Sequence, residues 1–582
     1  MSANPTVKVE RKTPTRREAA LFRIKTALLQ ARRLVEDRTS KRVARFRRRD
    51  DQSQWPVIAR SVTPLWTETD PRERSLTAGK IQNLRIAALR LNGVEVPAGE
   101  MFSFWKHVGR ATRRRGFVAG RELREGCIIP NVGGGLCQLS NALFEAAAEA
   151  NFEIAERHRH TQIVPGALAE AGRDATVFWN YVDLRFRSSK PFRLAARLDT
   201  ESLIVEIRGE KAEAKKFHQI DRRTASSEPG SCATCEAGDC HRVIRSSEAT
   251  EFGRRAWLVD EYFPEFDHYM REMRAASDVL CIPLDGKRFR KANYAWSTAG
   301  FRSRHQSLWV AAVRSYRSRK LAAQGAARQR DLLRMYRALA ESYAARLSYD
   351  VLHLTVQQNL LPFLWQAGVL GGRTFDVLMS ALPMREIQRR LDQAAALHPE
   401  SPTLGDFRAD SDLVACEAEA LSEARTVITP HTEIASLFPE RAMLIDWSIP
   451  KAERVDKKAG CKPVIVFPSS TVGRKGCYEL RDAIRGLDAK LITLGPYIES
   501  GSFWDGLDVE RGGGDWLARA DLVVLPAFVE HRPRRLLAAA AAGIPVIASE
   551  ACGVGNVSGI QPIQAGDTEA LRSAILKSLP SA

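Results

Sequence analysis

Short apolar runs of strand length alternate with helical segments through the second half of the chain. Three such runs are YDVLHLT (349–355), TFDVLMS (374–380) and ARTVITP (424–430), and helical segments lie around 311–343. From Lys462 the pattern repeats as PVIVFPSS, KLITLG, DLVVLPA and IPVIAS, with helices at 478–485 and before the last run. Strands that alternate with helices form parallel sheets with right-handed crossovers. The pattern predicts two doubly wound, Rossmann-like domains, at 255–455 and 456–582, with a ligand cleft at the carboxyl ends of their strands.

The segment from residue 80 to residue 180 mixes helices and strands less regularly. A helix is predicted from Asn83 and another over 137–150, which is rich in alanine and leucine. The glycines at 133–135 cannot sit inside a stable helix, so Cys137 is expected at a helix N-terminus. Strands are predicted over 154–164 and 174–179.

Candidate chemistry in this segment comes from one cysteine, two histidines and a carboxylate. A helix N-terminus favours the thiolate form of Cys137, because free N–H groups and the helix dipole stabilise negative charge. His158 and His160 are two residues apart, so in a strand they face the same side, and Asp174 begins the next strand. This order of parts is typical of a thiol-dependent hydrolase or acyltransferase. The alternative is a small buried cysteine with structural histidines.

Residues 1–55 are predicted to hold a basic amphipathic helix. Apolar positions recur at helical spacing among many Arg and Lys residues, at Leu21, Ile24, Leu28, Ala31 and Val35. Such a helix can lie on an anionic membrane surface, or it can be a solvated helix docked on its own protein. Nucleic acid is disfavoured as a partner, because no recognised nucleic-acid motif accompanies the charge.

Composition narrows the class of protein. The 582 residues are 44% hydrophobic and 27% charged, with a formal net charge of +19, which excludes a disordered or fibrous chain. No apolar run reaches the ~18–20 residues of a membrane-spanning helix, and the first residues do not resemble a secretory signal peptide. We expect a cytoplasmic location, peripheral on the inner face of the membrane, where the ten cysteines stay reduced.

A cysteine cluster lies in the polar linker at 211–254. Cys232 and Cys235 form a knuckle that presents two sulfurs to one metal ion, and Cys240 and His241 complete a four-ligand set. Because Cys240 and His241 are adjacent, a three-cysteine site with an outside ligand stays open. Zinc is expected ahead of an iron–sulfur cluster because the spacing is that of a knuckle. Free loop thiols or a redox-active pair are the alternatives.

The stretches GGGLCQLSNALF, ERHRHT, GRDATV and DLRF resemble, in order and spacing, the signature of VanW-type proteins, which are named after an accessory gene of vancomycin-resistance clusters. The resemblance covers about residues 80–210. It implies an α+β domain and a cell-envelope association, and it names no reaction. Many relatives carry an N-terminal membrane anchor or export signal, and this sequence departs from them there.

The stretches VGRKGCYELRDAIRGL and ADLVVLPAFVEHRPRRLLAAAAAGIPVIAS resemble the nucleotide-sugar half of GT-B retaining glycosyltransferases, with a weaker likeness back to residue 255. The resemblance implies a nucleotide-sugar ligand, with Lys475 neutralising the donor diphosphate and Glu530 beside the donor sugar. The second glutamate of the family falls at Ala538 and its usual arginine at Ser470. Positive charge near the site is available from Arg474, Arg534 and Arg535.

The sequence therefore predicts an α/β multidomain protein, with a VanW-type α+β domain followed by two GT-B-like domains. We expect a cell-envelope accessory protein that binds or modifies a glycan or peptidoglycan-type precursor, with a degenerate glycosyltransferase-like half. The alternative is an active nucleotide-sugar-dependent glycosyltransferase.

Overall fold

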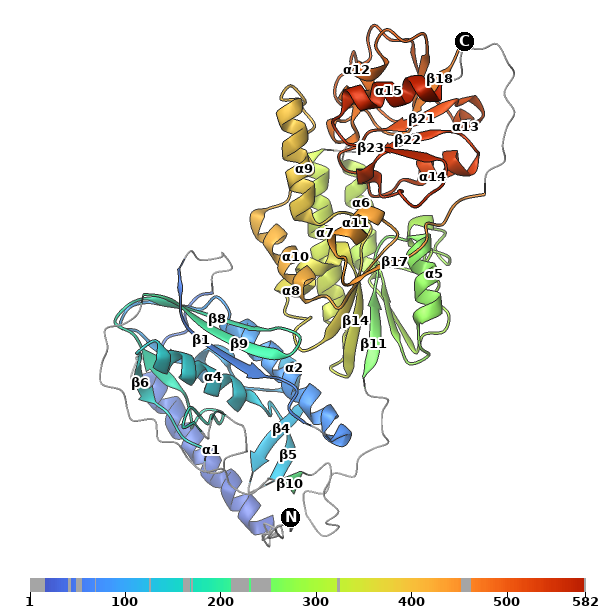
Figure 1. Cartoon of the computed structure of the whole chain (residues 1–582). Helices are drawn as coiled ribbons and strands as arrows, with labels where there is room; N and C mark the ends of the chain where they lie inside the picture. Colours follow the sequence, from blue (N-terminus) through green and yellow to red (C-terminus); the bar gives the residue numbers. More distant parts are fainter. Residues whose placement is uncertain are drawn as a thin grey trace, which may run out of the picture. The chain divides into compact units, whose positions relative to one another are not determined.

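The structure is a computed structural model that describes residues 16–39, 43–48, 55–68, 70–124, 127–160, 168, 171–210, 230–231, 253–321, 325–451 and 462–579. The chain divides into two compact units (Figure 1). The first unit comprises Met1–Arg254, Ser348–Leu352 and Ala367–Arg373, and the second comprises Arg255–Leu347, His353–Gln366 and Thr374–Ala582.

Small sheets and helices make up the first unit. An antiparallel sheet has the order β1-β9-β8-β2, from β1 (Val57–Pro64), β2 (Glu95–Val96), β8 (Phe192–Leu198) and β9 (Ser202–Gly209). A second sheet has the order β10-β5-β4, from β4 (Ala119–Arg124), β5 (Cys127–Val132) and β10 (Gly230–Ser231). A third has the order β3-β7-β6, from β3 (Met101–Ser103), β6 (Glu153–Glu156) and β7 (Arg185–Arg187). The helices are α1 (Arg16–Thr39), α2 (Arg74–Leu91), α3 (Phe104–Val108) and α4 (Leu136–Glu149).

The core of the first unit lies between the antiparallel sheet and helices α2 and α4. Both helices contact this sheet and each other, and their apolar faces are fully buried at Leu84, Leu139 and Leu143. This packing fixes the N-terminal end of α4, where Cys137 is the second residue.

Helix α1 contacts the rest of the first unit through polar side chains. Gln30 Nε2 donates to the carbonyl of Trp179 (3.0 Å), Arg33 pairs with Glu156, and Asp37 pairs with Arg185 (2.8 Å). The apolar stripe lies on the opposite side of the helix, since Leu21, Ile24, Leu28 and Val35 are each 58–67% exposed. A helix is therefore present at Arg16–Thr39, and these four apolar side chains face outward.

Two parallel sheets form the second unit. The first has the order β13-β12-β11-β14-β15-β16-β17, from β11 (Arg254–Leu258), β12 (Val279–Ile282), β13 (Ser303–Gln306), β14 (Val351–Gln357), β15 (Thr374–Leu378), β16 (Thr426–Thr429) and β17 (Ala442–Leu444). The second has the order β20-β19-β18-β21-β22-β23, from β18 (Val464–Phe467), β19 (Lys490–Thr493), β20 (Val509–Arg511), β21 (Leu522–Leu525), β22 (Val546–Ser549) and β23 (Ile560–Ile563).

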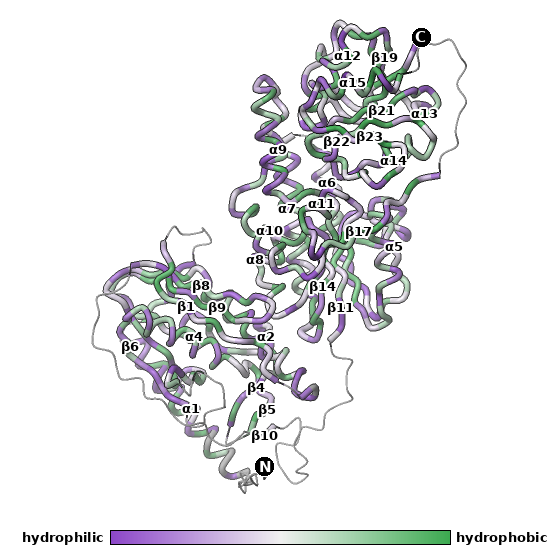
Figure 2. The backbone as a smooth tube through the Cα atoms, viewed as in Figure 1, coloured by the Kyte–Doolittle hydropathy of each residue, from purple (hydrophilic) through white to green (hydrophobic). Residues whose placement is uncertain are grey.

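Helices connect these strands in sequence order. They are α5 (Pro264–Met273), α6 (Leu308–Lys320), α7 (Ala326–Ala344), α8 (Leu361–Gln366), α9 (Met384–Leu397), α10 (Ser411–Glu423), α11 (Thr432–Leu437), α12 (Cys477–Ile484), α13 (Trp516–Arg519), α14 (Arg534–Ala541) and α15 (Thr568–Ser578). Strands such as β18 and β21 are buried along their whole length and hydrophobic (Figure 2). In both sheets the order reverses between the first and fourth strands, so the prediction of two doubly wound domains is confirmed.

Two predicted strands of the first unit are wrong. The strand expected over 154–164 ends at Glu156, and residues 174–179 form no strand. Hydrogen bonds from side chains hold these segments, and among their described residues no ladder of backbone hydrogen bonds forms between them. Arg157 Nε donates to the Asp174 carbonyl (2.7 Å), Asp174 Oδ2 accepts from the His160 N–H (2.6 Å), and the Ala175 N–H donates to Asn141 Oδ1 (2.8 Å).

Among the described helices, none combines the length and the apolar character needed to cross a bilayer. The predicted metal ligands Cys232, Cys235, Cys240 and His241 lie outside the described residues.

Candidate functional site

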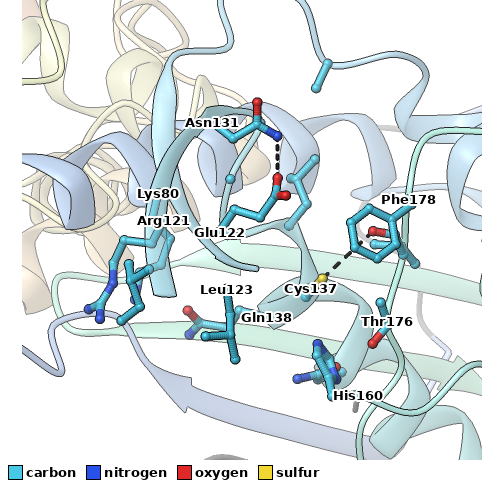
Figure 3. A pocket seen from close by; sticks show the side chains of 18 of the residues that line it. Lys80, Arg121, Glu122, Leu123, Asn131, Cys137, Gln138, His160, Thr176 and Phe178 are labelled. Atoms are coloured by element: carbon cyan, nitrogen blue, oxygen red, sulfur yellow. Dashed lines mark hydrogen bonds between the residues drawn. The ribbon is translucent and has the colours of Figure 1, made fainter. Parts of the chain in front are cut away.

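A cavity of about 830 Å³ lies in the first unit (Figure 3). Its wall contains Cys137, His160 and the glycines 133–135, together with charged residues at Lys80 and Arg121. The wall is mixed in character, because aromatic and aliphatic side chains such as Trp105, Phe178 and Leu123 also line it. A concave, mainly apolar site with a few polar groups is the usual form of a small-molecule or peptide binding site.

The glycine loop before α4 brings Cys137 into this cavity. Gly135 caps the helix with a φ of +96°, and a Cβ on it would stand 2.2 Å from Lys80 Cγ, so no other residue fits. Buried Asn83 holds the loop, because its Nδ2 donates to the Gly134 carbonyl at 2.9 Å. The Cys137 thiol is partly exposed and points toward the Val177 carbonyl at 3.9 Å.

His160 lies between the cavity of Cys137 and a buried carboxylate. His160 Nδ1 lies 2.9 Å from Asp174 Oδ2, and the imidazole lines the same cavity as the Cys137 thiol, which helps to raise the His160 pKa. Asp174 is fully buried, and Arg157 Nη2 lies 3.2 Å from its Oδ1. With Nδ1 bound to Asp174, Nε2 is the ring nitrogen that remains for a second partner, and a cysteine, a histidine and an orienting carboxylate are the parts of a thiol-dependent site.

Electrostatics favour the charged forms of this pair. Burial on its own would lower the pKa of His160, but hydrogen bonds and attraction from Asp174 and Cys137 raise it to about 9. Burial would raise the pKa of Asp174, but the hydrogen bonds from His160 and attraction from His160 and Arg157 lower it to about 2. Imidazolium and carboxylate are therefore both favoured near neutral pH.

Polar side chains of α4 clamp the segment after Asp174. Ser140 Oγ donates to the Ala175 carbonyl at 2.5 Å, and Asn141 Oδ1 accepts from the Ala175 N–H. Sequence reasoning did not single out Ser140 and Asn141. The signal was available, since they stand three and four residues after Cys137 in the helix and so share its face.

His158 lies elsewhere. Its side chain is 50% exposed, its Nε2 is 3.4 Å from Glu156 Oε1, and it is not part of the cavity wall. The structure therefore brings Cys137, His160 and Asp174 together and leaves His158 outside.

Lys80 and Arg121 form a second polar region of the cavity. Lys80 Nζ donates to the Leu65 carbonyl at 2.8 Å, and Arg121 pairs with Glu68 and with Glu73 (3.1 Å). Burial lowers the pKa of Lys80 to about 8 and that of Arg121 to about 10. Neither residue was predicted, because the sequence does not show that distant charges share one wall.

The predicted donor-binding residues of the second unit lie beside the reversal point of its second sheet. Lys475 ends a short 3₁₀ helix, η5 (Gly473–Lys475), that follows β18, and Glu530 follows β21. Lys475 Nζ donates to Glu530 Oε2 and to the Val529 carbonyl, each at 2.9 Å. Burial would raise the pKa of Glu530, but Lys475 lowers it to about 2.

The arginines near this pair have partners within the protein. Arg534 donates to both carboxylate oxygens of Glu265, and Arg535 donates to the Pro468 carbonyl at 2.8 Å. The Arg474 guanidinium lies 5.1 Å from the centre of the Phe407 ring. A second cavity, of about 200 Å³, is lined by residues of 432–436 and 548–562, and Lys475 and Glu530 do not line it.

No group of three or more His, Cys, Asp or Glu side chains suited to a metal ion occurs within the described ranges.

Residues 79–208 match a family model described as VanW like protein. The predicted VanW-like domain at 80–210 is thus confirmed, and most residues that line the thiol cavity, Cys137 and His160 among them, belong to it. The chain is 33% identical over 135 residues to "Uncharacterized protein YoaR" of Bacillus subtilis, and 31% identical over 137 residues to "Vancomycin B-type resistance protein VanW" of Enterococcus faecalis. Each match spans 23% of this chain, and the matched segment spans 44% of the first relative and 50% of the second, about half their length.

Solved glycosyltransferase structures are similar to the second unit at low identity. A sucrose-phosphate synthase from Thermosynechococcus elongatus has a TM-score of 0.36 and 15% identity, covering 56% of this chain and 89% of that one. An alpha,alpha-trehalose-phosphate synthase (UDP-forming) from Burkholderia vietnamiensis has a TM-score of 0.33 and 11% identity, covering 56% and 90%. The strand orders of the two parallel sheets define the doubly wound fold.

Proposed function

We propose that the VanW-like domain is a thiol-dependent hydrolase or acyltransferase that modifies a glycan or peptidoglycan-type precursor of the cell envelope. One observation carries the proposal. Cys137 lies at the start of a helix, in the wall of a cavity that His160 also lines, and His160 is held by buried Asp174. The VanW-like family match supports the cell-envelope setting.

Cys137, His160 and Asp174 each have a separate role in the proposed acyl transfer. The Cys137 thiolate attacks an ester or amide carbonyl carbon, a C–S bond forms, and the leaving group departs with the proton from the His160 imidazolium. Water or an acceptor hydroxyl or amine then cleaves the thioester, and His160 accepts its proton. Asp174 acts through His160 as a positioning residue, because it fixes the ring through Nδ1.

Alkylation by iodoacetamide tests the proposal without knowledge of the substrate. Cys137 should react at neutral pH faster than the other nine cysteines, because the thiolate fraction sets the rate. Peptide mass spectrometry of the folded protein measures each rate. A Cys137 that reacts only after unfolding would contradict the proposal.

The neighbouring histidines provide a matched pair of variants. His160→Ala should slow alkylation of Cys137 about tenfold or more, since the imidazolium that stabilises the thiolate is lost. His158→Ala should leave the rate unchanged, because His158 is half-exposed and outside the cavity. Equal rates in both variants would assign His160 a structural role.

The second unit is proposed to be a degenerate glycosyltransferase-like module that binds a nucleotide sugar weakly at best. Lys475 is already paired with Glu530, and Ala538 stands where a ribose-binding carboxylate is expected. The alternative is an active nucleotide-sugar-dependent glycosyltransferase. Micromolar binding of a UDP- or GDP-sugar by the natural chain, lost in Lys475→Ala, would establish that alternative.

Helix α1 is proposed to bind an anionic membrane surface. Its docked side is polar and its exposed side carries Leu21, Ile24, Leu28 and Val35, the reverse of a helix that packs on its own protein. Basic residues of the helix complement anionic lipid headgroups. This placement would bring the cavity close to membrane-bound precursors.

The cysteine cluster is proposed to bind zinc through Cys232, Cys235 and Cys240, with His241 or an outside group as fourth ligand. Metal analysis of the purified chain should find about one zinc, lost in Cys235→Ser. A chain that contains neither zinc nor iron after purification without chelators would remove the site.

A further inference from the structure

A hydroxyl without a partner lies in the wall of the thiol cavity. Thr176 is 9% exposed, and within the part of the chain that the structure describes its Oγ1 is buried and has no hydrogen-bond partner. Thr176 lines the same cavity as Cys137 and His160, and Figure 3 draws it between Phe178 and His160. An unpaired buried hydroxyl costs about 1–3 kcal/mol. Such a group in a native structure requires an explanation.

The backbone on both sides of this hydroxyl is firmly held. The Thr176 N–H donates to the His158 carbonyl at 2.7 Å, and Ser140 and Asn141 clamp the preceding residue. The carbonyl of the following residue, Val177, faces the Cys137 sulfur at 3.9 Å. The chain therefore fixes Thr176 beside the thiol while leaving its hydroxyl unbonded.

A backbone donor lies near the same thiol. Cys137 is the second residue of α4, and the first N–H groups of a helix have no acceptor in a preceding turn. The wall around the sulfur thus offers two hydrogen-bond donors, one from the helix start and one from a side chain. Two donors around a nucleophile are the composition of an oxyanion hole.

The geometry points to Thr176 as the side-chain donor of an oxyanion hole for acyl transfer at Cys137. The inference rests on the proposed thiol chemistry. When the thiolate adds to the carbonyl carbon, the C–S bond forms and the carbonyl π electrons move to the oxygen, which becomes negatively charged. Thr176 donates a hydrogen bond to that oxygen. When the C=O bond forms again, the bond to the leaving group breaks, and His160 supplies the proton that the leaving group takes.

Two reagents separate this role from others. p-Nitrophenyl acetate acetylates a thiol through an oxyanion, whereas iodoacetamide alkylates it by displacement of iodide without one. Thr176→Val should lower the acetylation rate of Cys137 tenfold to a hundredfold, since one oxyanion-hole donor contributes about 10²–10³ in kcat when fully engaged. The alkylation rate should stay within about a factor of two. Thr176→Ser should keep most of the acetylation rate, because it retains the hydroxyl.

Thr77 provides a matched control. Its hydroxyl is also buried and, among the described residues, without a partner, but it lies on α2 outside the cavity wall. Thr77→Val should change neither rate. The melting temperature of Thr176→Val should equal that of the natural chain or lie slightly above it, because no hydrogen bond is lost and the shape is conserved.

The outcomes distinguish this inference from the proposed function. A fall in acetylation alone, rescued by serine, supports the Thr176 assignment. Unchanged rates in Thr176→Val, or an equal fall in both rates, overturn it while leaving the thiol chemistry in place. If Cys137 of the natural chain reacts with neither reagent, the thiol chemistry itself is contradicted, and the Thr176 assignment falls with it.

Discussion

The cavity of the first unit and the second parallel sheet of the second unit use their charged groups in opposite ways. In the cavity, Asp174 binds one side of His160, and the Cys137 thiol lies in the same cavity wall as this imidazole. In the second unit, Lys475 and Glu530 bind each other at 2.9 Å, and neither lines the two cavities described above. Buried charge pairing therefore orients an imidazole beside an open cavity in one region and neutralises a buried lysine in the other.

This difference determines whether the charged group of each region can meet a ligand without first breaking a contact within the protein. A cation that binds a diphosphate has to leave its internal partner first, and the ligand has to offset that loss. The backbone beside Lys475 is engaged as well, because the Gly473 N–H donates to buried Glu499 at 2.5 Å. A thiol that already has its imidazolium needs only an electrophile. The comparison thus favours chemistry in the first unit and weak binding in the second.

The largest expected effect concerns the Lys475–Glu530 pair. Glu530→Ala should lower the free energy of unfolding of the second unit by about 3–5 kcal/mol, because it leaves Lys475 buried without its counter-charge. Urea denaturation measures this change. The double variant Lys475→Met with Glu530→Leu should regain most of the loss, since no unpaired charge remains. A cost under about 1 kcal/mol for Glu530→Ala would mean that Lys475 is free to bind a ligand.

The next effect is the pH dependence of the first unit. The pKa of His160 is raised from 6.5 to about 9, so its stabilising contribution is fully present below pH 6.5 and is lost as the pH rises through about 9. Asp174, whose pKa is lowered from 3.8 to about 2, contributes fully above pH 3.8 and loses its contribution as the pH falls through about 2. The pair therefore stabilises most between about pH 4 and 6.5.

Urea denaturation of the natural chain and of His160→Gln, at pH 6 and at pH 9.5, isolates this contribution. The natural chain should be more stable than the variant at pH 6 by roughly 3 kcal/mol, and the difference should shrink at pH 9.5. A difference that does not depend on pH would show that His160 is held as a neutral ring, without the charge pairing that the comparison requires.

The third effect concerns the missing ribose contact. A carboxylate makes charge-assisted hydrogen bonds to ribose hydroxyls worth about 1.5–3 kcal/mol each, and the methyl group of Ala538 makes none. Calorimetry with UDP- and GDP-sugars should find binding that is weak at best, and tenfold or more tighter in Ala538→Glu. Unchanged weak binding in Ala538→Glu would place the defect in the Lys475–Glu530 pair alone.

Much of the fold could be predicted from the sequence. The runs PVIVF and DLVVL are strands because every residue of β18 and β21 is buried, so the apolar pattern is continuous. The helix over 137–150 was predicted within one residue of α4, because the glycines before it break helical structure. Patterns of apolar residues and glycine report local structure directly.

The candidate site was less predictable for a physical reason. The segments around His160 and Asp174 share the backbone hydrogen bond from the Thr176 N–H to the His158 carbonyl, but within their described residues they form no strand ladder. Side chains of Arg157, Ser140 and Asn141 make further hydrogen bonds to the second segment. The separation of His160 from His158 follows from this irregular backbone. The outward direction of the apolar stripe of α1 depends on the ion pairs of Arg33 and Asp37, which join residues far apart in the sequence.

The smallest effect concerns this stripe. Ile24→Asn and Leu28→Asn should each weaken binding to vesicles rich in phosphatidylglycerol about fivefold, because each removes roughly 1 kcal/mol of apolar contact at the interface. These side chains are 59% and 67% exposed, so the folded unit should keep its melting temperature. Leu397→Asn is a matched control, since Leu397 is 50% exposed on α9 of the second unit. Co-sedimentation with vesicles of phosphatidylglycerol and of phosphatidylcholine measures the binding.

Binding that survives both α1 substitutions, with a shift from dimer to monomer in analytical ultracentrifugation, would assign the stripe to a second copy of the chain. The polar inner face and apolar outer face of α1 would then have been selected for self-association, and the cavity would no longer be tied to a membrane surface.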